Sequence, residues 1–174
     1  MNDAYPFQLT KSVEQFLENH ETYLLLGHKE PDGDCLGAPL ALASFLRRRG
    51  KQVHTYCEGP FSRPEIASFE SRFSAQVDPA DRAGDAAAII LDCSTVDRTG
   101  HPGEGIVGLP SLVIDHHASG DPFGDIRLIQ PTVPATALIV QFIIEMIDGK
   151  LTREEAELIL FAKCTDTGFF RHLR

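Results

Sequence analysis

Short apolar runs and longer segments of helical periodicity alternate along the chain. The short runs, each followed by glycine or polar residues, predict buried strands at 23–26, 53–57, 86–91, 112–114 and 126–129. The longer segments predict helices at 12–19, 36–46, 135–147 and 153–163, and Pro64 marks a further short helix. This alternation predicts an α/β domain with a mostly parallel sheet of about five strands and helices on both faces.

Local sequence patterns indicate where some of these elements begin and where one strand lies. Ser12 with Gln15, and Thr152 with Glu155, have the spacing of capping boxes, which predict the starts of two helices. Arg127 interrupts the apolar face of the last predicted strand. We therefore expect that strand at the edge of the sheet.

The composition limits the classes of function. The 174 residues are 43% hydrophobic, which is enough for one domain with its own core. The 16 basic and 25 acidic residues give a net charge of −9. This charge argues against a broad surface for long nucleic acid, which would require many cations. It does not exclude a small anionic substrate held by metal ions, because the ions supply positive charge.

The cysteines and the apolar segments indicate the compartment. The four cysteines form no C-x-x-C pair, so neither a disulfide framework nor a zinc ribbon is expected, and free thiols fit a reducing cytosol. The most apolar segment, 135–147, is interrupted by Gln141 and Glu145 and is too short to span a bilayer. The first residues do not resemble a signal peptide. We expect a cytoplasmic protein without a membrane partner.

Residues of the types that bind metals follow three of the predicted strands. In an open α/β sheet, ligands bind beyond the carboxyl ends of the strands, so these residues are expected to converge at one edge. A fourth candidate, Asp166, lies where the last helix is expected to end. The residues after the strands are His28, Asp32 and Asp34, then Asp92, then Asp115, His116 and His117.

The loop that contains the first group has a sequence suited to two neighbouring ligands. Pro31 fixes one backbone torsion and Gly33 frees the next, which favours a tight turn. Asp32 and Asp34 on such a loop can point to adjacent positions, an arrangement that suits two cations. The loop also opens the helix that contains Leu36, whose first N–H groups could hold a phosphate oxygen.

Charge counting supports a metal centre. Five clustered carboxylates, at positions 32, 34, 92, 115 and 166, would repel one another, and two divalent ions would offset four of the five charges. Histidine nitrogen combined with carboxylate oxygen suits Mn²⁺, Co²⁺, Zn²⁺ or Fe²⁺. Two ions about 3.5–4 Å apart can clamp the attacking and leaving oxygens of an in-line displacement and activate a water. Hydrolysis of a phosphate ester or anhydride suits such a site.

Four motifs of the chain resemble, in order, those of the DHH phosphoesterase superfamily. The similarity is greatest to the branch of oligoribonucleases (exonucleases), 3′-phosphoadenosine-5′-phosphate phosphatases and cyclic-dinucleotide phosphodiesterases. It extends over residues 27–168, nearly the whole chain. The motifs are Gly27-His28-x-x-Pro31-Asp32-Gly33-Asp34, Asp92-Cys93-Ser94, Asp115-His116-His117 and Thr165-Asp166-x-Gly168.

This resemblance implies a role for each candidate residue. His28 and Asp32 would hold one ion, and Asp92 would bridge it to a second. His117 would face the substrate phosphate or the leaving oxygen, and Asp115 would orient the histidine pair. The family usually works with Mn²⁺, so two Mn²⁺ ions are the expected cofactors. The shell of the second ion would be completed by Asp34, His116 and Asp166.

The sequence departs from the family pattern at several points. Ala38 stands where serine is usual, and Gly120 stands where asparagine is frequent. The chain also contains no Gly-Gly-His-type motif of the family's second domain. Residues 1–174 are therefore expected to be the N-terminal DHH catalytic domain, without the C-terminal substrate-binding domain and weakly active by themselves.

The expected function is hydrolysis of short oligoribonucleotides, 3′,5′-bisphosphonucleotides or cyclic dinucleotides by a water that two metal ions activate. One alternative is a family II inorganic pyrophosphatase. Gly33 and the pair Cys93-Ser94 weigh against it, because that family tends to have threonine and His-Asn there. A second alternative is a regulatory module that binds a nucleotide without cleaving it.

Overall fold

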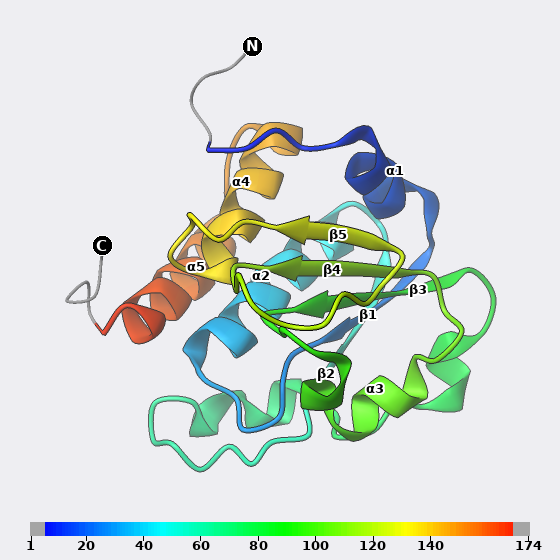
Figure 1. The fold of residues 1–174 in the computed structure, drawn as a ribbon, viewed down its shortest axis with the longest axis horizontal. Coiled ribbons are helices and arrows are strands. Elements are labelled where there is room, and N and C mark those ends of the chain that lie inside the picture. Colours follow the sequence, from blue (N-terminus) through cyan, green and yellow to red (C-terminus); the bar gives the residue numbers. More distant parts are fainter. Residues whose placement is uncertain (1–5, 169–174) are drawn as a thin grey trace.

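The sheet is fully parallel in the part of the chain that the structure describes. The computed structural model describes residues 6–168, and its strands have the order β2-β1-β3-β4-β5 (Figure 1). The α/β class and the expected edge position of the strand 126–129 are thus confirmed. The strands are β1 (Thr22–Leu26), β2 (Gln52–Tyr56), β3 (Ala86–Leu91), β4 (Ser111–Asp115) and β5 (Ile126–Ile129).

Helices cover both faces of the sheet, but unequally. The larger apolar cluster joins one face to α1, α2, α4 and α5, whereas the smaller cluster joins the other face to the segments around η2 and α3 (Figure 1). The helices are α1 (Lys11–Asn19), α2 (Gly33–Arg48), α3 (His101–Gly105), α4 (Thr136–Asp148) and α5 (Arg153–Asp166), with short 3-10 helices η1 (Ala67–Arg72), η2 (Pro79–Arg82) and η3 (Val96–Thr99).

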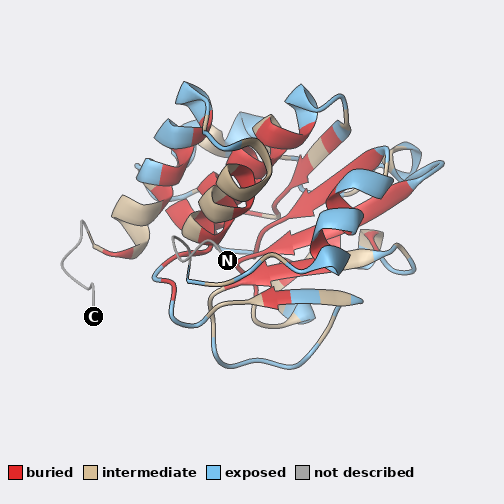
Figure 2. Ribbon diagram, turned by 90° about the horizontal axis from the view of Figure 1, so that it is seen from above, coloured by how far each residue is buried: buried red, intermediate tan, exposed pale blue. Residues whose placement is uncertain are grey.

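The central strands explain why the sheet is covered on both sides. Every residue of β1 and β3 is buried, and Figure 2 shows the central strands in the colour of buried residues. Alternate side chains of these strands enter the two apolar clusters. A run that is apolar at every position can be stable only between two layers. Because apolar layers cover both faces of the sheet, polar side chains that bind a ligand are expected beyond the carboxyl ends of the strands.

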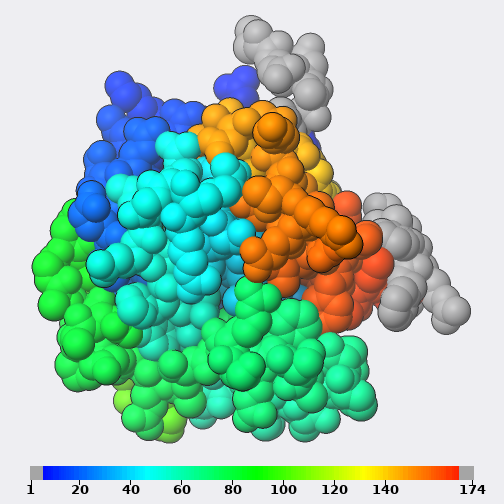
Figure 3. All heavy atoms as spheres, turned by 180° about the vertical axis from the view of Figure 1, so that it is seen from behind, coloured from blue at the N-terminus to red at the C-terminus, as the bar shows by residue number. Residues whose placement is uncertain are grey.

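The helices α2 and α5 approach each other closely on the larger face. A Cβ atom on Gly37 would lie 2.8 Å from both the Ala162 Cβ and the Leu158 carbonyl oxygen, so only glycine permits this packing. At the same end of the molecule, the Phe69 and Phe161 rings stack at 5.0 Å. Figure 3 shows the region that contains η1 lying against α2 and α5.

Two helix starts differ from the sequence expectation. The N-cap of α1 is Thr10, whose hydroxyl accepts the Val13 N–H, so the predicted capping box at Ser12 and Gln15 is wrong. The start of α2 is Gly33, three residues earlier than predicted, because Asp32 acts as its N-cap. The capping box of Thr152 and Glu155 is confirmed. No helix within residues 6–168 has the length and apolar composition to cross a membrane.

Glu155 offers a test of how α5 is held. Its buried carboxylate accepts the Thr152 N–H and the Arg48 Nε–H, both at 2.7 Å. We predict that Glu155→Ala lowers the free energy of unfolding by about 2 kcal/mol, because a cap and a charged hydrogen bond are lost. Urea denaturation of the metal-free chain measures this. The exposed Glu157→Ala on the same helix is the matched control, and an equal loss there would contradict the explanation.

Candidate metal centre

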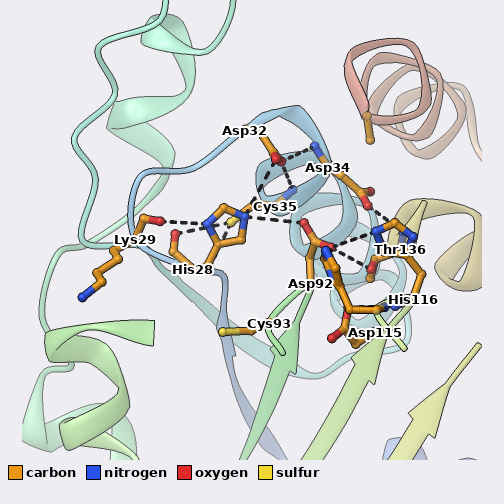
Figure 4. A network of polar contacts seen from close by, with 12 residues as sticks. His28, Lys29, Asp32, Asp34, Cys35, Asp92, Cys93, Asp115, His116 and Thr136 are labelled. Atoms are coloured by element: carbon orange, nitrogen blue, oxygen red, sulfur yellow. Dashed lines mark hydrogen bonds and ion pairs between the residues drawn. The ribbon is translucent and has the colours of Figure 1, made fainter. Parts of the chain in front are cut away.

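The strand order brings the predicted clusters together. Because β1, β3 and β4 are neighbours, the loop of His28, the end of β3 at Asp92 and the end of β4 at Asp115 meet at one edge of the sheet (Figure 4). Asp92 has a φ of 57°, a left-handed conformation that is uncommon for a residue other than glycine. Its N–H still donates to the Ile114 carbonyl at 3.0 Å, which holds it against β4.

The Asp92 carboxylate lies at the middle of the cluster and is almost fully buried. Its Oδ2 is 3.6 Å from His28 Nε2, and its Oδ1 is 3.5 Å from His116 Nε2 and 3.8 Å from His117 Nδ1. Burial opposes the charge of Asp92, but the three imidazoles outweigh this and lower the pKa of its carboxyl group. Thr136 Oγ1 also donates to Asp92 Oδ1 at 3.1 Å.

His28 presents one ring nitrogen to the carboxylates. Its Nδ1 lies 2.8 Å from the Lys29 carbonyl oxygen, which requires that Nδ1 donate a proton there. In the neutral ring Nε2 then has a free lone pair, and it is 3.9 Å from Asp32 Oδ2. Burial tends to lower the His28 pKa, but the contact with Asp92 raises it overall.

Asp32 has a local structural role as well. Its Oδ1 accepts the N–H groups of Asp34 at 3.1 Å and of Cys35 at 3.0 Å. The sequence had suggested that the first N–H groups of this helix could hold a phosphate oxygen. That suggestion is wrong for these two groups, because the Asp32 carboxylate already occupies them as the N-cap of α2.

Asp115 orients the two histidines that follow it. Its Oδ1 accepts the His116 N–H at 2.7 Å, the His117 N–H at 3.1 Å and the His117 Nδ1–H at 2.7 Å. The Asp115 hydrogen bond is the main reason that the pKa of His117 is raised. The His117 side chain is 38% exposed, whereas that of Asp115 is 2% exposed. The exposed imidazole is therefore fixed by a buried carboxylate.

Asp34 connects the first loop to the start of α4. Its two oxygens accept the N–H groups of Thr136 at 2.6 Å and Ala137 at 2.8 Å. Burial and the charge of Asp92 raise the pKa of Asp34 well above its ordinary value, although these N–H bonds oppose the shift. Sequence analysis missed Thr136 in this network. The sequence did offer one indication of this role, because Thr136 places a hydroxyl group at the start of a predicted helix.

Asp166 reaches the cluster from the end of α5. Gly33 makes this approach possible, because a Cβ there would lie 1.9 Å from Thr165 Oγ1. Burial and the negative charge of Asp92 raise the pKa of Asp166, while His116 opposes the rise. Asp34 is buried and Asp166 is partly exposed, and a cation bound between them would stabilise the charged forms of both carboxyl groups.

The geometry gathers all eight candidate residues into overlapping groups. Within each group, one potential ligand atom per residue lies within 4.8 Å of the others. Asp92 and His116 each belong to two groups, which suits adjacent ions that share a ligand. The mixture of imidazole and carboxylate suits Mn²⁺, Zn²⁺ or Fe²⁺. The groups are His28, Asp32 and Asp92; Asp34, His116 and Asp166; and Asp92, Asp115, His116 and His117.

Comparison with known proteins agrees with this geometry. Residues 22–163 match the family described as "DHH family, N-terminal domain". The chain belongs to the DHH family. The family and the enzyme class that the four motifs predicted, a hydrolase of phosphate esters, are thereby confirmed. The matched range contains every candidate residue except Asp166.

Two curated relatives are similar along most of the chain. One is the bifunctional oligoribonuclease and PAP phosphatase NrnA of Thermus thermophilus, which is 32% identical over 83% of this chain and 43% of its own length. The other is the protein of the same name from Bacillus subtilis, which is 26% identical over 87% of this chain and 48% of its own length. The chain thus spans about half the length of these DHH relatives.

A solved structure shares the fold. An exopolyphosphatase-related protein from Bacteroides fragilis superposes with a TM-score of 0.80 at 22% identity, covering 94% of this chain and 54% of that one. At this identity the likeness concerns the fold alone.

The pair of Asp115 and His117 yields a pH prediction for the metal-free chain. We predict that His117 titrates above its ordinary value and that Asp115→Asn lowers its pKa, because the imidazolium loses its anionic partner. NMR titration of the imidazole resonances measures the change. Since the folded-state pKa is raised, the pair stabilises the fold at low pH, and this contribution disappears as the pH rises through that pKa.

His28 is the internal control for this titration. Its partners are Asp92 and Asp32 rather than Asp115, so its raised pKa is expected to stay unchanged in Asp115→Asn. An unchanged His117 pKa in the variant would contradict the assigned hydrogen bond.

Proposed function

We propose that this chain is the catalytic domain of a phosphoesterase that uses two Mn²⁺ ions to hydrolyse short nucleotide substrates. The substrates are short oligoribonucleotides, 3′,5′-bisphosphonucleotides or cyclic dinucleotides. The activities in the names of the two relatives, oligoribonuclease and PAP phosphatase, support this class. The observation that carries the proposal is the buried Asp92 carboxylate, which lies between His28 on one side and His116 on the other.

The donor set divides into two shells around Asp92. His28 and Asp32 would hold one ion, and Asp92 would be shared with a second. When bound, the ions would supply an activated water and positive charge for the phosphate oxygens. The ligands of the second ion would be completed by Asp34, His116 and Asp166.

The residues around the two proposed ions have different roles. His117 is the most exposed member of its group, so it is the one that would contact the phosphate or the leaving oxygen. Because its Nδ1–H stays with Asp115, the proton that a protonated His117 can donate is the one on Nε2. Asp115 is then a positioning residue. Thr136 and the Asp34 hydrogen bonds hold Asp92 and the start of α4 in place.

The charge of the chain supports a short substrate. A net charge of −9 provides no broad cationic surface, so the attraction for phosphate would come from the ions themselves. The four cysteines are free thiols, which fits the proposed cytoplasmic location.

Metal stoichiometry tests the shared ligand. We predict two Mn²⁺ ions per chain in a calorimetric titration, and an affinity for the second ion at least about tenfold weaker in Asp92→Asn, because that variant loses a shared carboxylate. Asp121→Asn, which removes an exposed carboxylate outside the three groups, is the matched control. Absence of binding in the micromolar range by a folded chain would refute the metal centre.

Activity assays distinguish the proposed function from its alternatives. With Mn²⁺ present, the chain should hydrolyse a diadenylate faster than pyrophosphate. His117→Gln should lower kcat about 10²–10⁴-fold, because it removes a general acid, while both ions still bind. Faster hydrolysis of pyrophosphate would indicate the pyrophosphatase. Nucleotide binding without hydrolysis in the full-length protein, with metal supplied, would favour the non-catalytic module.

A further inference from the structure

A second concave surface lies beside the metal centre and takes no part in it. This hollow measures about 420 Å³ and lies between the loop after β1, the end of β2, η3 and α3. Its volume falls within the range of about 300–1,000 Å³ that is usual for small-molecule sites. We call it the η3–α3 hollow. The lining residues that matter to its chemistry are Lys29, Glu58, Val96, Asp97, Glu104 and Val107.

The hollow and the metal centre share one wall. Lys29, which lines the hollow, directly follows His28, and its N–H donates to the Arg98 carbonyl oxygen at 2.7 Å. This bond ties the loop of the metal ligand His28 to η3. Figure 4 shows the Lys29 side chain pointing away from the carboxylates that surround His28. The hollow is therefore connected to the loop of His28.

The hollow has an apolar rim that the fold does not require. Within residues 6–168 only three large hydrophobic side chains are exposed, and two of them, Val96 and Val107, line the hollow. Val96 is 47% exposed and Val107 is 72% exposed. Exposed apolar side chains gathered at a concave surface are typical of a ligand site.

The charges of the hollow exclude a phosphate and suit hydrogen-bond donors. Its lining contains one lysine, Lys29, and three carboxylates, those of Glu58, Asp97 and Glu104. Glu58 Oε2 accepts the His101 N–H at 2.8 Å, and no hydrogen bond to Glu58 Oε1 is found in the described part of the chain. Gly100, with a φ of 64°, makes room for this carboxylate, because a Cβ there would lie 1.7 Å from Oε2.

We propose that the η3–α3 hollow holds a nucleobase of the substrate, preferably one that carries amino groups, such as guanine. The apolar rim would cover the ring, and a carboxylate would accept its N–H groups, as carboxylates do from amino groups of bases. The phosphate would remain at the metal ligands. The inference rests on the proposed function and adds to it the part of the substrate that is recognised.

A binding experiment that needs no turnover tests this assignment. Amide NMR spectra of the chain are recorded with Mg²⁺, which avoids the broadening caused by Mn²⁺, while GMP, UMP or ribose 5-phosphate is added. We expect GMP to shift amide resonances of residues 96–107, and ribose 5-phosphate to shift only those near the metal ligands. GMP should bind at least about fivefold more tightly than ribose 5-phosphate, because the base buries apolar surface.

Two variants separate the apolar and polar parts of the proposal. Val107→Glu should abolish the advantage of GMP over ribose 5-phosphate, whereas Leu160→Glu, at the third exposed apolar position, should keep it. Glu58→Gln should reduce the preference for GMP over UMP while retaining an acceptor for the His101 N–H.

The outcomes distinguish this inference from the proposed function. If GMP and ribose 5-phosphate cause the same shifts near the metal ligands and none at residues 96–107, the base assignment is wrong and the metal centre stands. If neither Mg²⁺ nor Mn²⁺ shifts or broadens the resonances of the metal loops, the proposed function fails first. Shifts at residues 96–107 that persist in Val107→Glu would also overturn the assignment.

Discussion

The placement of one buried carboxylate, Asp92, determines most of what surrounds it. A charged group at the end of a buried strand is costly unless opposite charges or hydrogen bonds compensate it. Three imidazoles and the Thr136 hydroxyl provide that compensation, and they come from the loops after β1 and β4 and from α4. The elements that carry these groups must therefore meet at one edge of the sheet. The parallel order β1-β3-β4 achieves this, because the carboxyl ends of neighbouring parallel strands lie at the same edge of the sheet.

The same cluster makes the fold and the metal interdependent. Asp34 and Asp166 both have raised pKa values, because burial and neighbouring carboxylates oppose their charged forms. Asp34 nevertheless keeps α4 in place through two backbone N–H groups. Cations at the cluster would remove the repulsion while leaving these hydrogen bonds intact. The close packing of α2 on α5 at Gly33 and Gly37 is what brings Asp166 to the cluster.

The sequence predicted the parts of the fold that depend on local apolar patterns. The strands β3 and β5 lie where their runs predicted them, and each candidate ligand follows from the position of a strand end or helix end. The errors concern polar contacts between segments. Thr10 and Ser12 both fit an N-cap, and only the structure shows that Thr10 is used. Segments 96–107, rich in glycine and turn residues, carry no periodic pattern, so η3, α3 and the η3–α3 hollow could not be predicted.

Under the proposed function, the positions of charge around the candidate metal centre would divide the recognition of a nucleotide between two surfaces. The metal ligands are an anionic cluster that becomes attractive to phosphate only when cations are bound, whereas the hollow keeps an excess of carboxylates whether or not the ions are present. A phosphate would therefore bind favourably at the metal centre and unfavourably in the hollow. A base with amino groups would bind favourably in the hollow. Lys29 lines the hollow and directly follows His28 in the sequence, so the two surfaces share one loop. The base and the phosphate of one nucleotide would then bind to different surfaces according to their charge. Such an arrangement would favour recognition of a short substrate at its end over the tracking of a long phosphate backbone.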